Sequence, residues 1–225
     1  MPTDIAEQVS QVIIGKILLL IPIVFIIGLV RVFLSSPKVK GAIGEKVISH
    51  GILRKLDPIF YTVYDDVYLP RPDGRGTTQI DHVVVSPFGV FVIETKNMKG
   101  WIFGDEKSKQ WTQTLYRKKF RFQNPLHQNQ LHVNALAKSL QIPKEKLKNV
   151  VFFIGDVRLK TELPSNVLTE GLVGYIHGFQ CQELNADECE RIQSGLRELD
   201  RGVDRKAVQK KHVQDVQERS MAKSR

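Results

Sequence analysis

The first strong pattern along the chain is an apolar stretch near the N-terminus. Residues 12–34 are mostly apolar, and their only charges are Lys16 and Arg31. A helix of about 20 such residues crosses the hydrocarbon core of a bilayer, and long charged side chains near its ends can reach the headgroups. The pattern therefore predicts one transmembrane helix, preceded by an N-terminal tail (1–11) and followed by a polar linker (35–40).

The charges around this stretch indicate its orientation. Asp4 and Glu7 precede it, whereas basic residues such as Lys38 and Lys40 follow it. A cleaved signal peptide carries its basic residues before the apolar core, so that interpretation fits less well. The positive-inside bias places the N-terminus outside and the rest of the chain in the cytoplasm, anchored to the cell membrane. A buried core helix is the remaining alternative.

Beyond the linker, apolar runs predict a folded domain over residues 41–180. Strong strand patterns at 78–86 (TQIDHVVVS) and 89–96 (GVFVIETK) are separated only by Pro87-Phe88, as in a hairpin. The other expected elements are helices at 41–56 and 124–141, strands at 61–69 and 149–155, and weaker strands at 100–103 and 111–116. This order is typical of an α/β or α+β sandwich with one mixed sheet flanked by helices.

The composition becomes more charged towards the C-terminus. Residues 201–225 hold eight basic and three acidic residues and almost no large apolar ones. Segments with this composition cannot bury enough apolar surface to build a core of their own. We therefore expect residues 181–225 to form a charged helical or disordered tail.

The whole chain is basic, with 33 Lys and Arg against 24 Asp and Glu and a net charge of +9. This surplus favours nucleic acid or an anionic membrane as a partner, although a solvated basic surface gives the same count. Cys181 and Cys189 are the two cysteines. They suggest neither a disulfide framework nor a zinc site, which fits a reducing compartment.

Candidate chemistry lies on the predicted hairpin. If four residues form its turn, Val85 pairs with Val90, and the antiparallel register then places Asp81 opposite Glu94. Like charges in that position destabilise a sheet unless a cation compensates. A divalent ion between the carboxylates is one solution, and Lys96 on the same face is a partial second. A solvated strand face is the alternative, but the valines beside the carboxylates indicate that this face packs against something.

Glu45 adds a third carboxylate. On the first predicted helix it lies close to the apolar stripe of Ile48, Ile52 and Leu56, so its side chain projects towards whatever that stripe covers. The alternative is a glutamate placed in the first turn because the helix dipole favours a negative charge there.

Several motifs resemble the nuclease-related domain (NERD) family, which is grouped with the restriction-endonuclease-like PD-(D/E)xK superfamily. They are GAIGE at 41–45, QIDHVVV at 79–85, GVFVIETK at 89–96, Gln110-Trp111, and NPLHQ at 124–128. The resemblance covers roughly residues 40–155. One departure from the superfamily pattern is Ile80, which stands where a proline precedes the first acidic residue.

The resemblance implies a restriction-endonuclease-like sheet and metal-dependent hydrolysis of phosphodiester bonds in DNA. The implied metal ligands are Asp81, Glu94, the carbonyl of Thr95 and Glu45, and the implied catalytic residues are Glu45, Asp81, Glu94, Lys96 and Gln128. Oxygen ligands of this kind suit Mg²⁺ or Mn²⁺, which would activate a water molecule and neutralise charge on the phosphate. Lys96 would orient or help deprotonate the water, and Gln128 would position the nucleophile or a phosphate oxygen.

Basic side chains gather between residues 96 and 121, where eight stand against two acidic ones, with aromatic residues between them. Basic groups can follow a phosphate backbone while aromatic faces stack on bases. An edge strand protected by lysines, with the aromatic rings in the core, fits equally well. The candidate nucleic-acid-binding residues are Lys99, Lys107, Lys109, Trp111, Arg117, Lys118, Lys119 and Arg121.

Together these features predict a membrane-anchored, metal-dependent nuclease that acts on DNA. One rival is a non-catalytic module that binds nucleic acid at the membrane. Another is a structural membrane protein whose basic tail contacts anionic lipid. The sequence leaves open a homo-oligomer, the choice between DNA and RNA, and the choice between single and double strands.

Overall fold

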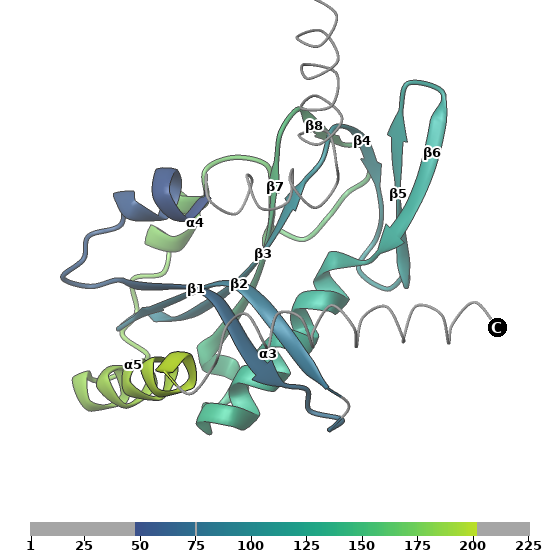
Figure 1. Cartoon of the computed structure of the whole chain (residues 1–225). Helices are drawn as coiled ribbons and strands as arrows, with labels where there is room; N and C mark the ends of the chain where they lie inside the picture. The colour runs from purple at the N-terminus through teal and green to yellow at the C-terminus, as the bar shows by residue number, and fades with distance from the viewer. Residues whose placement is uncertain (1–47, 75, 202–225) are drawn as a thin grey trace, which may run out of the picture. The chain divides into compact units, whose positions relative to one another are not determined.

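The computed structural model of the chain describes residues 48–74 and 76–201 (Figure 1). The expected transmembrane helix (12–34), Glu45 and the basic residues of 202–225 lie outside the described residues. Within the described part, no helix is long and apolar enough to cross a membrane.

The larger sheet has five strands in the order β1-β2-β3-β7-β9. They are β1 (Thr62–Pro70), β2 (Thr77–Ser86), β3 (Gly89–Asn97), β7 (Leu147–Ile154) and β9 (Val167–Leu168). The first three strands are antiparallel neighbours, whereas β7 runs parallel to β3 and β9 runs parallel to β7. The central strands are apolar on both faces, as expected for a sheet covered on both sides.

The β2–β3 hairpin has the register that the sequence predicts. Val85 pairs with Val90, and the paired residues continue as far as His82 and Ile93. The turn is closed by Ser86, whose hydroxyl donates to the carbonyl of Gly89 and accepts from the amide of Phe88. Because side chains alternate along a strand, this register directs one set of valines towards one layer of helices and the other set towards the opposite layer.

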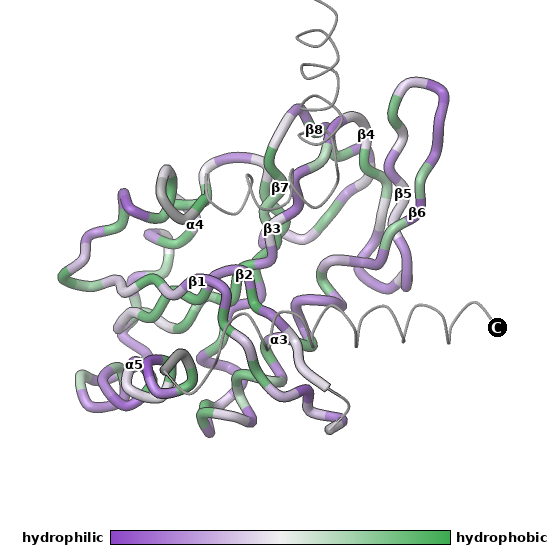
Figure 2. The backbone as a smooth tube through the Cα atoms, in the orientation of Figure 1, coloured by the Kyte–Doolittle hydropathy of each residue, from purple (hydrophilic) through white to green (hydrophobic). Residues whose placement is uncertain are grey.

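A second sheet has four strands in the order β6-β5-β4-β8, where the sequence predicts a single sheet. Its strands are β4 (Gly100–Phe103), β5 (Gln110–Leu115), β6 (Lys118–Gln123) and β8 (Val157–Leu159). β6 was not among the expected strands, although the alternation of Lys119, Phe120, Arg121 and Phe122 has the period of a strand. β5 and β6 form a long hairpin with a hydrophilic tip (Figure 2).

Two glycines separate the sheets. Along the chain β4 follows β3 and β8 follows β7, and Gly100 and Gly155 stand at these two junctions with φ angles of 85° and 99°. A Cβ on Gly100 would lie 2.5 Å from the carbonyl oxygen of Thr114, and one on Gly155 would lie 2.4 Å from that of Met98. Both positions therefore need glycine for the backbone angle and for the close approach of a neighbouring segment.

Helices cover both faces of the larger sheet. α3 (Pro125–Leu140) and α5 (Ala186–Arg201) pack on one face, and the short α4 (Leu172–His177) packs on the other. α3 begins as predicted, with Pro125 in its first turn and the Asn124 side chain accepting from the amide of Leu126. The described part of the predicted helix at 41–56 consists of a π-helical turn, η1 (Ile48–Ile52), and a 3-10 turn, η2 (Leu53–Lys55). A further 3-10 turn, η3 (Lys144–Lys146), precedes β7.

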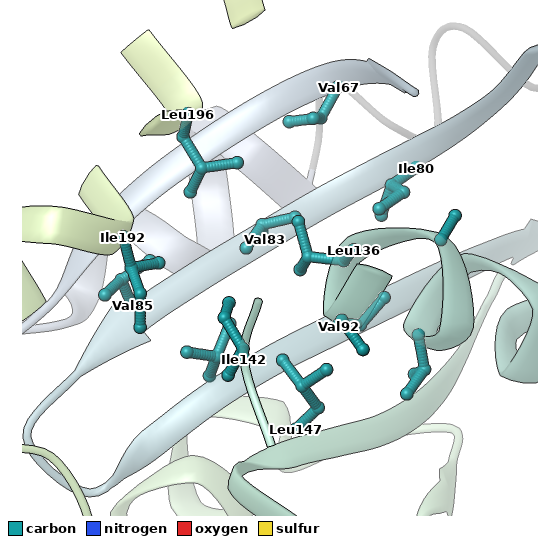
Figure 3. Close-up of a cluster of buried hydrophobic side chains, with 14 of the residues drawn as sticks. Val67, Ile80, Val83, Val85, Val92, Leu136, Ile142, Leu147, Ile192 and Leu196 are labelled. Carbon is teal, nitrogen blue, oxygen red and sulfur yellow. The ribbon is translucent and has the colours of Figure 1, made fainter. Parts of the chain in front are cut away.

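α5 lies inside residues 181–225, which were expected to form a charged helical or disordered tail, and it is helical. Its residues Cys189, Ile192 and Leu196 are buried in the same cluster as Val83 and Val85 of β2, as Figure 3 shows for Ile192 and Leu196. The packed core therefore continues past residue 180, and α5 belongs to it.

Candidate functional site

Polar side chains from β2, β3 and α3 meet at the end of the core between the larger sheet and α3. Glu94 and Lys96 follow Val90 and Val92 on the same face of β3, and both valines are buried in the cluster that includes α3. The period of two therefore directs Glu94 and Lys96 at the N-terminal half of this helix. There they contact Gln128 and His132.

The Glu94 carboxylate is the centre of this group and is only 2% exposed. Its Oε1 accepts from Lys96 Nζ at 2.5 Å and from Gln128 Nε2 at 2.7 Å. Lys96 Nζ also donates to Gln128 Oε1 at 3.0 Å, which closes a triangle of hydrogen bonds. Oε2 accepts no hydrogen bond from the described residues, although His132 Nε2 lies 3.3 Å away.

Asp81 is tied to the same stretch of β3. Its Oδ2 accepts from the backbone amide of Thr95 at 2.8 Å. Thr95 is the residue between Glu94 and Lys96, so this bond holds the Asp81 carboxylate at the edge of the group. The regular ladder ends one pair earlier, at His82 and Ile93. Asp81 and Glu94 are thus the next positions in the predicted register.

His132 is a part of the site that was not among the residues expected from the sequence. It is 4% exposed, and its Nδ1 lies 3.0 Å from the hydroxyl of Thr78. When that hydroxyl donates to Nδ1, the neutral ring carries its proton on Nε2, the nitrogen nearest to Glu94. His132 could have been predicted as a site residue from its spacing to Gln128, because residues four apart lie on one face of a helix.

Asn129 fixes α3 against the sheet beside this group. Its side chain is fully buried, and its Nδ2 lies within hydrogen-bonding distance of the carbonyls of Val92 and Val150 and of the side-chain oxygen of Asn149. Val92 and Val150 belong to the two central strands, so this single amide links the helix to both. Gln128, the preceding residue, is thereby held over Glu94.

The electrostatics of the group favour an ionised Glu94. Burial alone would raise the pKa of this carboxyl. The Lys96 ammonium, followed by His132, outweighs burial and lowers the pKa of Glu94 to about 2. The carboxylate is therefore charged at neutral pH although it is withdrawn from water.

Asp81 and Glu94 are suitable ligands for a hard divalent cation, because such cations prefer carboxylate oxygens. Glu94 Oε2 is buried, and its contact with His132 Nε2 at 3.3 Å is long for a hydrogen bond to a carboxylate, so this oxygen can accept a further partner. The residues present therefore fit a metal ion. Among residues 48–74 and 76–201, no group of three or more His, Cys, Asp or Glu is arranged to hold one. Beyond the two carboxylates, the candidates named from the sequence are the Thr95 carbonyl and Glu45.

Most of the predicted nucleic-acid-binding residues lie on the surface of the second sheet and its loops. The exposed ones are Lys99, Lys107, Lys109, Arg117, Lys118, Lys119 and Arg121. Trp111 differs, because it is 0% exposed and its ring stacks on Phe153. Its Nε1 donates to the carbonyl of Asp105. The structure corrects this assignment and places Trp111 in the core, where it cannot contact a nucleic acid.

Comparison with known proteins adds a family to this geometry. The family model described as "Nuclease-related domain" matches residues 40–154, more than half of the 225 residues. An uncharacterized protein of Bacillus anthracis is 52% identical over 100 residues, which are 44% of this chain and 46% of that protein. The match thus spans about half the length of that curated relative. No solved structure matches the chain.

Proposed function

The chain belongs to the nuclease-related domain family, within the restriction-endonuclease-like superfamily, and on that premise we propose that it is a metal-dependent nuclease that hydrolyses phosphodiester bonds in DNA. Family membership by itself indicates a nuclease-like role and an interaction with nucleic acid. The two mixed sheets flanked by helices agree with a restriction-endonuclease-like fold.

The observation that supports catalysis is the buried group around Glu94. Two carboxylates, a lysine and a glutamine converge from β2, β3 and α3. A structural role alone needs only one cation for one buried carboxylate. Lys96 and His132 already surround Glu94, so the additional Asp81 carboxylate beside them exceeds that requirement, and together with Glu94 it offers oxygen ligands for a metal ion.

In the proposed reaction, Asp81 and Glu94 would hold Mg²⁺ or Mn²⁺, and the Thr95 carbonyl and Glu45 are the further ligands that the sequence suggests. When bound, the ion supplies Lewis-acid activation of water and neutralises charge on the phosphate. The ligand set requires ionised carboxylates, and the low pKa of Glu94 meets that requirement throughout the physiological range.

Lys96 and Gln128 supply the remaining chemistry from this chain. Lys96 Nζ is shared between Glu94 and Gln128, so a small movement of its flexible stem would bring the ammonium to a phosphate oxygen or to the attacking water. Its positive charge there would stabilise the negative charge that develops on phosphorus-bound oxygens. The Gln128 amide both donates and accepts within this triangle, and it would hold Lys96 in place and orient the nucleophile.

The test is a cleavage assay with the full chain in mild detergent, on plasmid and single-stranded DNA, with Mg²⁺, Mn²⁺ or EDTA. We expect cleavage with either metal and none with EDTA. Asp81→Asn and Lys96→Met should each lower the cleavage rate by roughly a hundredfold or more, since each removes a group that acts on the transition state. Glu190→Gln and Lys138→Ala are matched controls, because both side chains lie on exposed helix surfaces away from the site.

Retention of cleavage in both site variants would refute the assignment of the site. A wild-type chain that binds DNA in a salt-dependent manner and cuts nothing under any metal would instead favour the non-catalytic module. Mn²⁺ binding by calorimetry separates these cases further, because the site should bind the ion even where no cleavage is seen, and Asp81→Asn should abolish that binding.

We also propose that residues 12–34 anchor the chain in the cell membrane with the nuclease-related domain in the cytoplasm. The support is the length of this apolar stretch and the basic residues that follow it. The full chain should stay in the membrane fraction after a high-salt or carbonate wash. Recovery of the washed full chain in the soluble fraction would refute the anchor.

A further inference from the structure

The strand pairing of the second sheet separates its side chains into two faces. Ile102 is buried, and its neighbours Gln113 on β5 and Leu159 on β8 share its face. That face covers the cluster of Trp111, Leu126 and Phe153. Residues adjacent to Ile102 along β4 must point the other way, because side chains alternate along a strand.

The opposite face, here called the platform, is aromatic and basic. Trp101 and Phe103 of β4 lie on it, and they are 48% and 37% exposed. Directly paired residues share a face, so the register adds neighbours from the other three strands. They are Thr112, Thr114, Lys119, Arg121 and Arg158. Lys160 joins them, since its Nζ lies 4.6 Å from the centre of the Trp101 ring.

The platform carries four cations and none of its members is acidic. Lys119, Arg121, Arg158 and Lys160 are all exposed, and they surround two aromatic rings on a surface of four strands. These rings are not part of the core below the sheet, which Ile102 and Trp111 of the other face form together with Phe153 of β7. Exposed apolar rings amid cations are a common arrangement for binding a polyanion that also has flat, stackable groups.

We propose that the platform binds single-stranded nucleic acid, with unpaired bases stacked on Trp101 and Phe103 and the phosphates paired with the surrounding cations. This inference rests on the proposed nuclease function and specifies its substrate as unpaired strands. Bases in a duplex already stack on each other and turn only their edges outward, so an aromatic side chain gains stacking contacts only with unpaired bases. Trp101 lies five residues after Lys96, so the backbone between them spans at most about 18 Å.

The experiment measures binding separately from cleavage, with the full chain in mild detergent and EDTA. The probes are oligonucleotides of about 15 nucleotides. They are single-stranded DNA, single-stranded RNA of the same sequence, and the DNA duplex. The chain has two tryptophans, and Trp101 is the exposed one. Single strands should therefore quench its fluorescence by stacking, and the quench should be lost in Trp101→Phe, in which only the buried Trp111 remains.

Trp101→Ala should weaken single-strand binding roughly tenfold and leave duplex binding unchanged. Phe60→Ala is the matched control, because Phe60 is also 48% exposed and belongs to the turn before β1. Thermal unfolding of each variant shows that the fold is intact. The DNA and RNA probes reveal which strand the platform prefers, and either preference supports it.

Three results would overturn the proposal. They are unchanged single-strand binding in Trp101→Ala, an equal loss for single strands and duplex, and a Trp101 fluorescence change with anionic lipid vesicles but not with oligonucleotides. Failure of the nuclease is distinguishable from failure of the platform. A chain that stacks single strands on Trp101 and cleaves nothing would uphold the platform while refuting the proposed activity.

Discussion

At the scale of single residues, the site depends on how Glu94 remains charged away from water. Some of its neighbours could be predicted from the sequence and others could not. Glu94 and Lys96 share a strand face by simple alternation, and the hairpin register brought in Asp81. His132 and Thr78 could not be assigned in this way, because their contact joins a helix to a strand 54 positions earlier in the chain. Only tertiary packing places them together.

The low pKa of Glu94 predicts a specific pH dependence of stability. The folded chain binds a proton at this site less readily than the unfolded chain, whose glutamate has a pKa near 4.5. The stabilisation is therefore complete above about pH 4.5 and is lost as the pH falls towards 2. In EDTA, the free energy of unfolding of the wild type should exceed that of Glu94→Gln by on the order of 3 kcal/mol at neutral pH. Denaturant unfolding at several pH values measures the difference, which should shrink in acid.

We expect His132 to position Glu94 as a ligand. His132→Ala should weaken Mn²⁺ binding, measured by calorimetry, by roughly 10- to 100-fold, as the loss of a group that orients a metal ligand does. His127→Ala is the control, because His127 is exposed on the same helix and lies near the carbonyl of Glu106 instead. Equal metal affinity in wild type and His132→Ala would show that the histidine only fills space.

At the scale of elements, the sequence predicted the hairpin and α3 well, because each depends on local signals. The hairpin has two runs rich in β-branched residues around a short turn, and α3 has an Asn-Pro start. It failed for β6 and for the packing of α5, where charge obscures the pattern. The apolar residues of α5 at 189, 192, 196 and 199 nevertheless have the spacing of a helix that packs on one face. The high charge of the remaining positions concealed this stripe.

The burial of α5 predicts that one of its side chains matters for the whole fold. Ile192 is fully buried in the cluster shared with β2 and α3. Ile192→Ala should lower the free energy of unfolding by roughly 2–5 kcal/mol, since it leaves a cavity in a packed core. Glu198→Ala, on the exposed side of the same helix, should change it by about 0.5 kcal/mol or less. Urea unfolding followed by circular dichroism measures both, and equal values would contradict a packed α5.

At the scale of the whole molecule, the candidate catalytic group and the platform lie on different sheets. The larger sheet and α3 hold the candidate catalytic group, whereas the second sheet carries the exposed basic and aromatic platform. The net charge indicated a polyanionic partner for the chain as a whole, but it did not indicate which surface binds that partner. The distinction between Trp101 on the surface and Trp111 in the core required the strand register, which the sequence did not reveal for these strands.

The platform predicts how salt weakens binding. Each phosphate neutralised on a single strand contributes about 0.7 to the slope of the logarithm of affinity against the logarithm of salt concentration. Lys119→Ala should therefore reduce the slope for single-stranded DNA by about 0.7. Lys138→Ala, on the exposed surface of α3, should leave it unchanged. Fluorescence titrations over a range of NaCl concentrations measure the slopes, and an unaltered slope in Lys119→Ala would exclude this lysine from phosphate contact.

Gly100 and Gly155 also constrain how the sequence can evolve. Each permits a bend in one of two neighbouring strands, and a Cβ at either position would strike a carbonyl oxygen of an adjacent segment. If one strand straightened, it would no longer pair with its neighbour. A mutation at one glycine therefore requires a change in the other strand as well. The two positions should therefore covary, so that both glycines are kept or both are lost. Lineages that keep the second sheet should retain both glycines, and lineages that lose one should show a rebuilt or missing sheet.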